Sequence, residues 1–234
     1  MSTESIRAHS RRYSNGAALA LGEDGFEDTE SGFRSDRPAS TNITGDAFLI
    51  FQQESGKAKM KLSVVNDTLP ISLSAFESLF LAENAPYGFK QYHESVKDTN
   101  VVMSAWSEPS PGLGTGREMK FFKPVNLPGL ASTRGVKIQR LRRFATVGMI
   151  LYSVTKLEDV PAADTFSVDD VLSVCSVGEG KLSVEISFQV TFLKSTFMKY
   201  IIEKSTNAEM SKWLDAYFQH LKKVYCIYIY QTIY

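Results

Sequence analysis

The chain has 234 residues, in which 26 lysines and arginines balance 26 aspartates and glutamates. This length favours one domain with extensions over two full domains. A net charge near zero argues against a general nucleic-acid-binding protein, whose affinity depends on many phosphate contacts. Cys175 and Cys226 are expected to be free thiols in a reducing compartment. The three histidines lie near neither a cysteine cluster nor one another, so no metal site is expected.

The N-terminal region, residues 1–57, is rich in Ser, Gly, Arg, Asp and Glu and has no sustained periodicity. We expect it to be disordered. Its one apolar run, from Gly45 to Phe51, is a candidate for docking on the folded domain. No secretory signal is recognised at the start, and no segment reaches the ~20 apolar residues that span a bilayer.

The folded part begins near residue 58, where apolar and polar residues start to alternate. The alternation predicts strands at 59–65, 99–106, 117–123, 134–143, 147–156, 165–176 and 181–192. Two short helices are expected between the first two strands, at 75–81 and 88–94. Consecutive strands with short links favour an antiparallel sheet with helices gathered on one face. The predicted fold class is α+β.

The most regular strand runs from Lys181 to Phe192, KLSVEISFQVTF, with every second residue apolar. Side chains alternate along a strand, so this strand has one apolar face and one polar face. At ~3.3 Å per residue it is about 40 Å long. The helix predicted next, at 196–224, is ~43 Å long at ~1.5 Å per residue. A strand and a helix of equal length can enclose an apolar space that holds a ligand.

That helix carries apolar residues on two nearly opposite faces. One face holds Phe197, Ile201 and Ala208, and the other holds Met210, Trp213, Tyr217, Leu221 and Val224. A straight helix cannot point both sets at one sheet, so we expect a kink or break near 205–207, or else burial on two sides. We expect the first half to face the cavity and the second half to seal the fold.

The tail at 225–234 is too aromatic and β-branched to be typical of a helix end. It fits an interfacial segment, a strand or the product of an unusual splice. We favour the last interpretation.

No constellation of residues predicts catalysis. The run Gly112 to Gly116 precedes a strand instead of opening a helix, so we interpret it as a hairpin connection and not as a phosphate loop. His93, Glu94 and the Lys97–Asp98 pair are interpreted as capping and ion-pair residues. Nothing resembles a Ser/His/Asp or Cys/His set. We therefore expect neither an enzyme nor a cofactor.

Five cations occur close together with no acidic residue among them. They are Arg134, Lys137, Arg140, Arg142 and Arg143. A solvated strand face is one interpretation. A peripheral membrane contact is the other, because the cations follow an apolar Pro/Gly loop at 126–131. Such a contact combines loop insertion with ~1 kcal/mol per cation near anionic lipid.

Several motifs recur in a recognisable order. They are HESVKDT at 93–99, Trp106, REMKF at 117–121, NLPG at 126–129, DVP at 159–161, IIEK at 201–204 and WLDAYF at 213–218. In this order they resemble the VASt domain of the Aster and Lam proteins and their plant relatives. The resemblance covers about residues 58–224 and is specific because the motifs are collinear.

The resemblance implies a StART-like helix-grip fold. In it, a curved antiparallel sheet of six to seven strands, two short helices and a long C-terminal helix enclose a cavity for a sterol. It also implies a monomeric, cytoplasmic domain that is peripheral to membranes, with family members located at endoplasmic reticulum contact sites. Family members commonly carry a GRAM domain upstream and a membrane-spanning helix downstream, and neither pattern is visible here. The family's lid loop maps onto 125–133, centred on Asn126, Leu127, Pro128, Gly129 and Leu130.

Alternation within the implied pocket strands gives a candidate ligand-binding wall. Its members are Met119, Phe121, Leu151, Ile186, Phe188 and Val190 from strands, and Phe197 and Ile201 from the helix. An ordinary core explains each of them equally well. Burying ~400 Å² of sterol at ~25 cal/mol/Å² contributes on the order of 10 kcal/mol before association costs.

Three hypotheses follow. The leading one is sterol binding and transfer between membranes, with an anionic membrane surface as partner. The alternative is a module that recruits partners or senses anionic lipid without carrying cargo, and bulky side chains that meet at the centre of the pocket would favour it. The third, an enzyme of the related cyclase type, would need polar catalytic groups inside the cavity, and the strand at 181–192 offers none on its apolar face.

Overall fold

The computed structural model describes residues 43–127 and 129–233. A helix, α1 (Ile43–Ala58), precedes the first strand, β1 (Leu62–Leu69). A helical segment follows, made of α2 (Leu73–Phe76), the π-helical turn η1 (Glu77–Leu81) and α3 (Phe89–Ser95). The remaining strands are β2 (Thr99–Met103), β3 (Thr115–Leu127), β4 (Leu130–Phe144), β5 (Gly148–Leu157), β6 (Phe166–Gly178) and β7 (Lys181–Phe192). A 3-10 turn, η2 (Ala163–Thr165), precedes β6, and α4 (Lys199–Ile233) ends the described chain.

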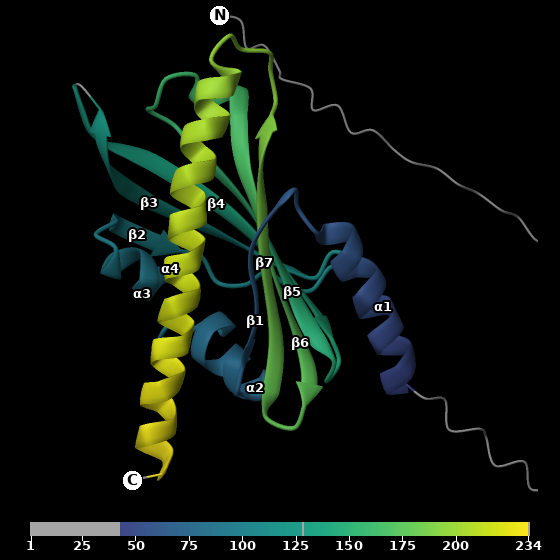
Figure 1. Cartoon of the computed structure of the whole chain (residues 1–234). Helices are drawn as coiled ribbons and strands as arrows, with labels where there is room; N and C mark the ends of the chain where they lie inside the picture. Colours follow the sequence, from purple (N-terminus) through teal and green to yellow (C-terminus); the bar gives the residue numbers. More distant parts are fainter. Residues whose placement is uncertain (1–42, 128, 234) are drawn as a thin grey trace, which may run out of the picture. The chain divides into compact units, whose positions relative to one another are not determined.

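All seven strands form one antiparallel sheet in the order β1-β7-β6-β5-β4-β3-β2. Only the step from β1 to β7 joins strands that are not consecutive along the chain. The α+β prediction and its helix-grip form are confirmed, because a long C-terminal helix lies across one face of this sheet (Figure 1).

The sheet has two unlike faces. The inner face, covered by α2, α3 and α4, carries the alternate residues of β7 that were predicted to be apolar, including Ile186 and Phe188. The outer face carries a smaller apolar cluster around Phe144, Ile150 and Val171. Helix α1 packs on that cluster, on the opposite side of the sheet from α4 (Figure 1).

Helix α1 occupies residues 43–58, a stretch that was expected to be disordered, so that prediction is wrong there. The suggested docking of the Gly45 to Phe51 run is confirmed, since Phe51 is buried with its ring 5.4 Å from that of Phe144. The Ser55 and Ser173 hydroxyls are 2.7 Å apart. The rest of the N-terminal region, residues 1–42, lies outside the described residues.

Helix α4 runs without a break from Lys199 to Ile233, so the expected break near 205–207 is wrong. Its second half seals the fold as expected, with Leu214, Tyr217 and Leu221 buried against the sheet. Residues 225–233 continue the helix, which corrects the interpretation of the tail as non-helical. One face of this unbroken helix packs on the sheet, so no break is needed to bring its apolar residues onto the inner face.

Candidate functional site

The inner face gathers the six strand residues that were proposed as a ligand-binding wall. Met119, Phe121, Leu151, Ile186, Phe188 and Val190 are all buried there. Leu151 pairs with Leu172, which in turn pairs with Ile186, so these residues form a continuous apolar strip across three strands. Their placement fits both a pocket wall and an ordinary core.

The two helix residues of the proposed wall lie elsewhere. Phe197 is 98% exposed and precedes α4, and Ile201 is 62% exposed on its first turn. The adjacent Ile202 is the buried residue, at 6% exposure. The prediction that the first half of the helix faces the cavity is therefore wrong for these two side chains. Both apolar faces of the helix exist, but only one of them packs on the sheet.

A row of polar residues crosses the middle of the inner face. Arg117 on β3 is opposite Gln139 on β4, which is opposite Ser153 on β5, which is opposite Asp170 on β6. All four side chains are buried. We call these four residues the polar row. Apolar strips flank it, so the inner face is amphipathic and not uniformly apolar.

Arg117 stands at one end of the polar row. Its Nε donates a hydrogen bond of 2.8 Å to the Gln139 Oε1 atom. Its guanidinium carbon lies 4.0 Å from the centre of the Trp106 ring. Burial lowers the pKa of Arg117 to about 10, because the charged form is separated from water.

The other end of the polar row holds a buried ion pair. Lys137, two residues before Gln139 on β4, donates from Nζ to Asp170 Oδ1 at 2.6 Å. The same ammonium lies 5.6 Å from the centre of the Trp213 ring. Lys137 is thus buried in the interior. The prediction that it contacts a membrane is wrong for this conformation.

The other cations of that run lie outside the core. Arg134 pairs with Glu158 and Asp159, Arg142 pairs with Glu54, and Arg143 pairs with Glu77. Arg140 is exposed. The acidic partners that are missing from the local sequence come from distant segments, including α1 and η1, so four of the five cations serve ion pairs.

Aromatic rings fill the space between the polar row and α4. Tyr217 stacks on Phe89 with ring centres 4.7 Å apart, and Trp213 lies parallel to Tyr217 at 5.9 Å. His93 lies against Phe121, with a centre separation of 4.6 Å. Bulky side chains therefore meet at the centre of the fold.

His93 forms a second buried polar pair on this side. Its Nδ1 is 2.7 Å from Asp98 Oδ2, and both side chains are almost completely buried. Burial lowers the pKa of His93, and the hydrogen bond with Asp98 acts in the opposite direction. The lowered pKa favours a neutral His93, so the ion pair predicted for this segment takes the form of a buried hydrogen bond between His93 and Asp98.

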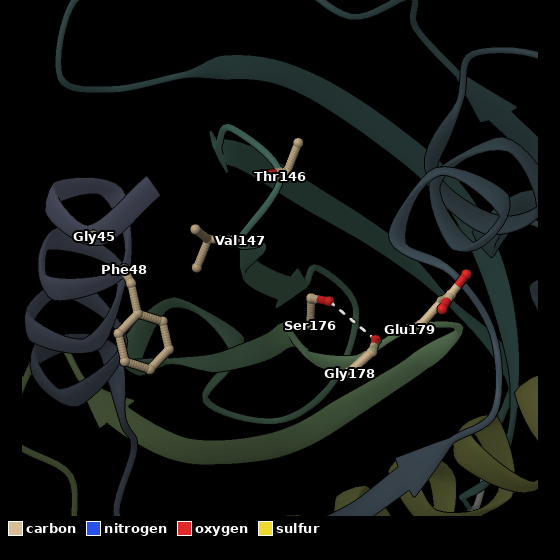
Figure 2. Close-up of a pocket in the computed structure, with 7 residues that line it drawn as sticks. All are labelled: Gly45, Phe48, Thr146, Val147, Ser176, Gly178 and Glu179. Atoms are coloured by element: carbon tan, nitrogen blue, oxygen red, sulfur yellow. Dashed lines mark hydrogen bonds between the residues drawn. The ribbon is translucent and has the colours of Figure 1, made fainter. Parts of the chain in front are cut away.

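Two hollows open on the surface of the described part of the chain. One, of about 610 Å³, lies between α1, the start of β5 and the end of β6, and is lined by Phe48, Val147 and Glu179 among others (Figure 2). The other, of about 320 Å³, lies beside the end of β7 and the start of α4 and is lined by Val190, Lys199 and Glu203 among others. Val190 belongs to the candidate wall, so this second hollow reaches one edge of the inner face.

The predicted lid loop is the hairpin between β3 and β4. Leu127 pairs with Leu130, and Gly129 adopts a φ of +76°, which favours glycine. Pro128 lies outside the described residues. Asn126 is the next-to-last residue of β3. The strand order places this hairpin at the same end of the sheet as the end of β7 and the start of α4.

Within residues 43–127 and 129–233, no helix is both long enough and apolar enough to cross a bilayer. The same residues contain no cluster of three or more side chains suited to a metal ion.

Comparison with known proteins agrees with the architecture. The sequence profile of the VASt domain, the VAD1 Analog of StAR-related lipid transfer domain, matches residues 63–209. The chain belongs to the VASt family. Protein VASCULAR ASSOCIATED DEATH 1, chloroplastic, of Arabidopsis thaliana is 25% identical over 143 residues, which are 59% of this chain and 24% of that protein. The chain thus spans about a quarter of that relative, and the family is a lipid-binding one, not a known enzyme family.

Sequence reasoning missed the polar row of this VASt domain. Its members are separated by up to 53 positions along the chain, from Arg117 to Asp170, and meet only through the pairing of four strands. The sequence held one sign of buried polar residues on β4. Ile138 is exposed, so its neighbours Lys137 and Gln139 lie on the opposite, buried face of the strand.

Proposed function

We propose that this VASt domain binds one amphipathic lipid molecule between the inner face and α4 and transfers it between membranes, without covalent chemistry. The observation that carries the proposal is the long amphipathic inner face covered by α2, α3 and the long helix α4. A sterol is the cargo that the family resemblance implies. The described conformation is filled, so uptake requires the lid hairpin or α4 to move away from the sheet.

We assign the membrane-facing surface to the start of α4 instead of the run of cations at 134–143. Leu193, Phe197, Tyr200 and Ile201 are large exposed apolar side chains at the lid end of the sheet. Lys194, Lys199 and Lys204 lie among them. Apolar side chains interleaved with cations suit the interface of an anionic membrane. This surface supports a peripheral membrane contact, and the family resemblance adds the expectation of a monomeric, cytoplasmic domain.

The test uses the full chain with a fluorescent sterol in donor vesicles of phosphatidylcholine and phosphatidylserine. Wild-type protein should move the sterol to acceptor vesicles. The Phe197→Asp and Ile201→Asp variants, and Leu127→Asp in the lid, should slow this movement about tenfold, because each places a charge where apolar insertion is needed. The matched control is Leu113→Asp, at a leucine that is 54% exposed and lies before β3, at the other end of the sheet.

A second candidate function is a membrane or partner-recruitment module that carries no cargo. The aromatic stack of Tyr217, Phe89 and Trp213 favours it, because bulky rings occupy the centre of the fold. Mass spectrometry of lipid that co-purifies with the full chain separates the two functions. No bound lipid, together with vesicle binding that depends on Phe197, would support the module and exclude transfer.

A further inference from the structure

Arg117 is an unusual buried cation. Its side chain is 4% exposed, and the two carboxylates buried on its side of the sheet are engaged by other groups. Asp170 accepts from Lys137, and Asp98 faces His93. Asp170 is also three strands from Arg117, about 14 Å away at ~4.8 Å per strand. Among the described residues, Arg117 therefore has no carboxylate within ion-pair distance, and a buried charge without an opposite charge is strongly disfavoured.

The groups around Arg117 have hydrogen-bonding capacity to spare. Arg117 Nη2, Gln139 Nε2, Ser153 Oγ and Tyr217 Oη are buried and have no hydrogen-bond partner among the described residues. Gln139 uses its carbonyl oxygen to accept from Arg117, so its free atom is the amide donor. A guanidinium, an amide N–H and two hydroxyls that can donate are thus left unpaired, three of them in the polar row and one on the buried face of α4. The set offers donors and a positive charge.

The Tyr217 hydroxyl lies on the buried face of α4 and has no hydrogen-bond partner among the described residues. Burial raises the pKa of Tyr217, and the charge of Arg117 acts in the opposite direction. The Trp106 ring packs on the guanidinium, and Trp106 Nε1 is itself fixed by donating to the Leu81 carbonyl at 2.9 Å. The guanidinium is therefore positioned by neighbours that do not neutralise it.

We propose that Arg117, Gln139 and Tyr217 bind the anionic head group of a lipid, a carboxylate or a phosphate monoester, whose acyl chain lies along the apolar strip of Leu151 and Ile186. The inference rests on the proposed lipid binding and specifies its cargo. A negative head group supplies the charge and the acceptor oxygens that this site lacks. A sterol hydroxyl supplies a single oxygen and leaves the guanidinium unneutralised.

The experiment mixes the lipid-free full chain with phosphatidylcholine vesicles that contain a minor share of oleate, phosphatidic acid or cholesterol. The protein is separated from the vesicles, and the lipid retained per protein is measured by mass spectrometry. We expect retention of oleate or phosphatidic acid at least about tenfold above that of cholesterol, since a charge-assisted hydrogen bond and one tenfold affinity step are of similar size. The oleate and phosphatidic acid samples distinguish the carboxylate from the phosphate.

The decisive variant is Arg117→Met, which keeps an unbranched apolar stem and removes the guanidinium and its charge. It should lose the acidic lipid about tenfold while the lipid-free protein stays as resistant to urea as the wild type, because an unpaired buried charge is removed. Tyr217→Phe keeps the stacked ring, removes only the unpartnered hydroxyl and should lower retention about threefold. Lys156→Met, which removes an exposed cation from β5, is the control and should change neither quantity.

Each result decides a separate point. Retention of cholesterol but not of either acidic lipid, or acidic-lipid retention that Arg117→Met leaves unchanged, overturns the head-group site and leaves lipid binding intact. Retention of no lipid at all overturns the proposed function together with this inference. If Arg117→Met fails to fold, Tyr217→Phe decides, and unchanged retention in that variant also overturns the site.

Discussion

Lys137 on β4 and Asp170 on β6 form a 2.6 Å ion pair that passes over the intervening strand β5. Ser153 and Thr155 are the β5 residues beneath it, paired by register with Asp170 and Lys137 respectively. Both charges are buried under the aromatic rings of α3 and α4. The pair links three central strands on the face where α4 docks.

Removing one member of this pair should be far more damaging than removing both. Lys137→Met leaves Asp170 as an unpaired buried carboxylate and should lower the free energy of unfolding by about 3–5 kcal/mol. The Lys137→Met, Asp170→Leu double variant should recover most of that loss, because no charge remains buried. Urea denaturation of the full chain measures both. Additive losses in the double variant would show that the two side chains do not interact as a pair.

Gly135 on β4 is required by the ring of Phe121 on β3. A Cβ atom at position 135 would lie 2.4 Å from the tip of that ring, closer than any real contact. Gly135→Ala should therefore lower the free energy of unfolding by about 1–3 kcal/mol. Adding Phe121→Leu should reduce the cost of the alanine, since a smaller side chain leaves room for the methyl group.

Gly178 provides the matched control for that substitution. It ends β6, and nothing lies within 4 Å of a Cβ added there. Gly178→Ala should leave the urea midpoint unchanged or raise it slightly. Equal effects at positions 135 and 178 would contradict the close approach of the Phe121 ring.

The Phe121 and Gly135 pair also illustrates how far the sequence leads. Alternation in the strands placed the apolar residues of β3, β5 and β7 on the inner face, because the period of two is local. Phe121 and Gly135 meet only through the register of β3 with β4, which no local pattern encodes. The polar row was missed for the same reason, because its residues also meet only through the register of neighbouring strands.

The start of α4 shows a different limit. Phe197 and Ile201 fit a helix face as well as Ile202 does, and periodicity alone cannot say which face meets the sheet. The contacts in the folded chain settle the orientation, because Ile202 packs into the core whereas Phe197 and Ile201 are exposed. For α1, low periodicity and a polar composition hid a helix that is stabilised by tertiary contacts, mainly those of Phe51.

Helix α1 should depend on that single aromatic anchor. Phe51→Ala should lower the free energy of unfolding by about 3 kcal/mol if α1 and the sheet unfold together. If α1 undocks alone, hydrogen exchange at 43–58 should become fast while exchange in β5 and β6 changes little. Either result would show that Phe51 anchors α1 on the sheet. If neither hydrogen exchange nor stability changes, Phe51 is not the anchor. Leu49→Ala is the control, since Leu49 lies on the same helix and is exposed.

Stability should fall as the pH drops below neutrality, and His93 should carry much of the change. Burial lowers the pKa of His93 in the folded state below its ordinary value of 6.5. The unfolded chain therefore binds this proton more readily, so stability is full above the unfolded-state pKa and is lost as the pH falls from there towards the folded-state pKa. Within that window the loss is up to about 1.4 kcal/mol per pH unit.

The measurement is the free energy of unfolding between pH about 7.5 and about 5.5, a range above the titration of the exposed carboxylates. The pKa values of Glu54, Asp67, Asp159 and Asp164 are lowered by their cation and backbone partners, so those groups lose their stabilising effect only in more acidic solution. His93→Gln keeps a donor for Asp98 and should flatten the pH dependence. Burial lowers the pKa of His220 as well, so His220→Gln should flatten it by a smaller amount, because His220 is less buried. An unchanged slope in His93→Gln would show that this imidazole is protonated equally in both states.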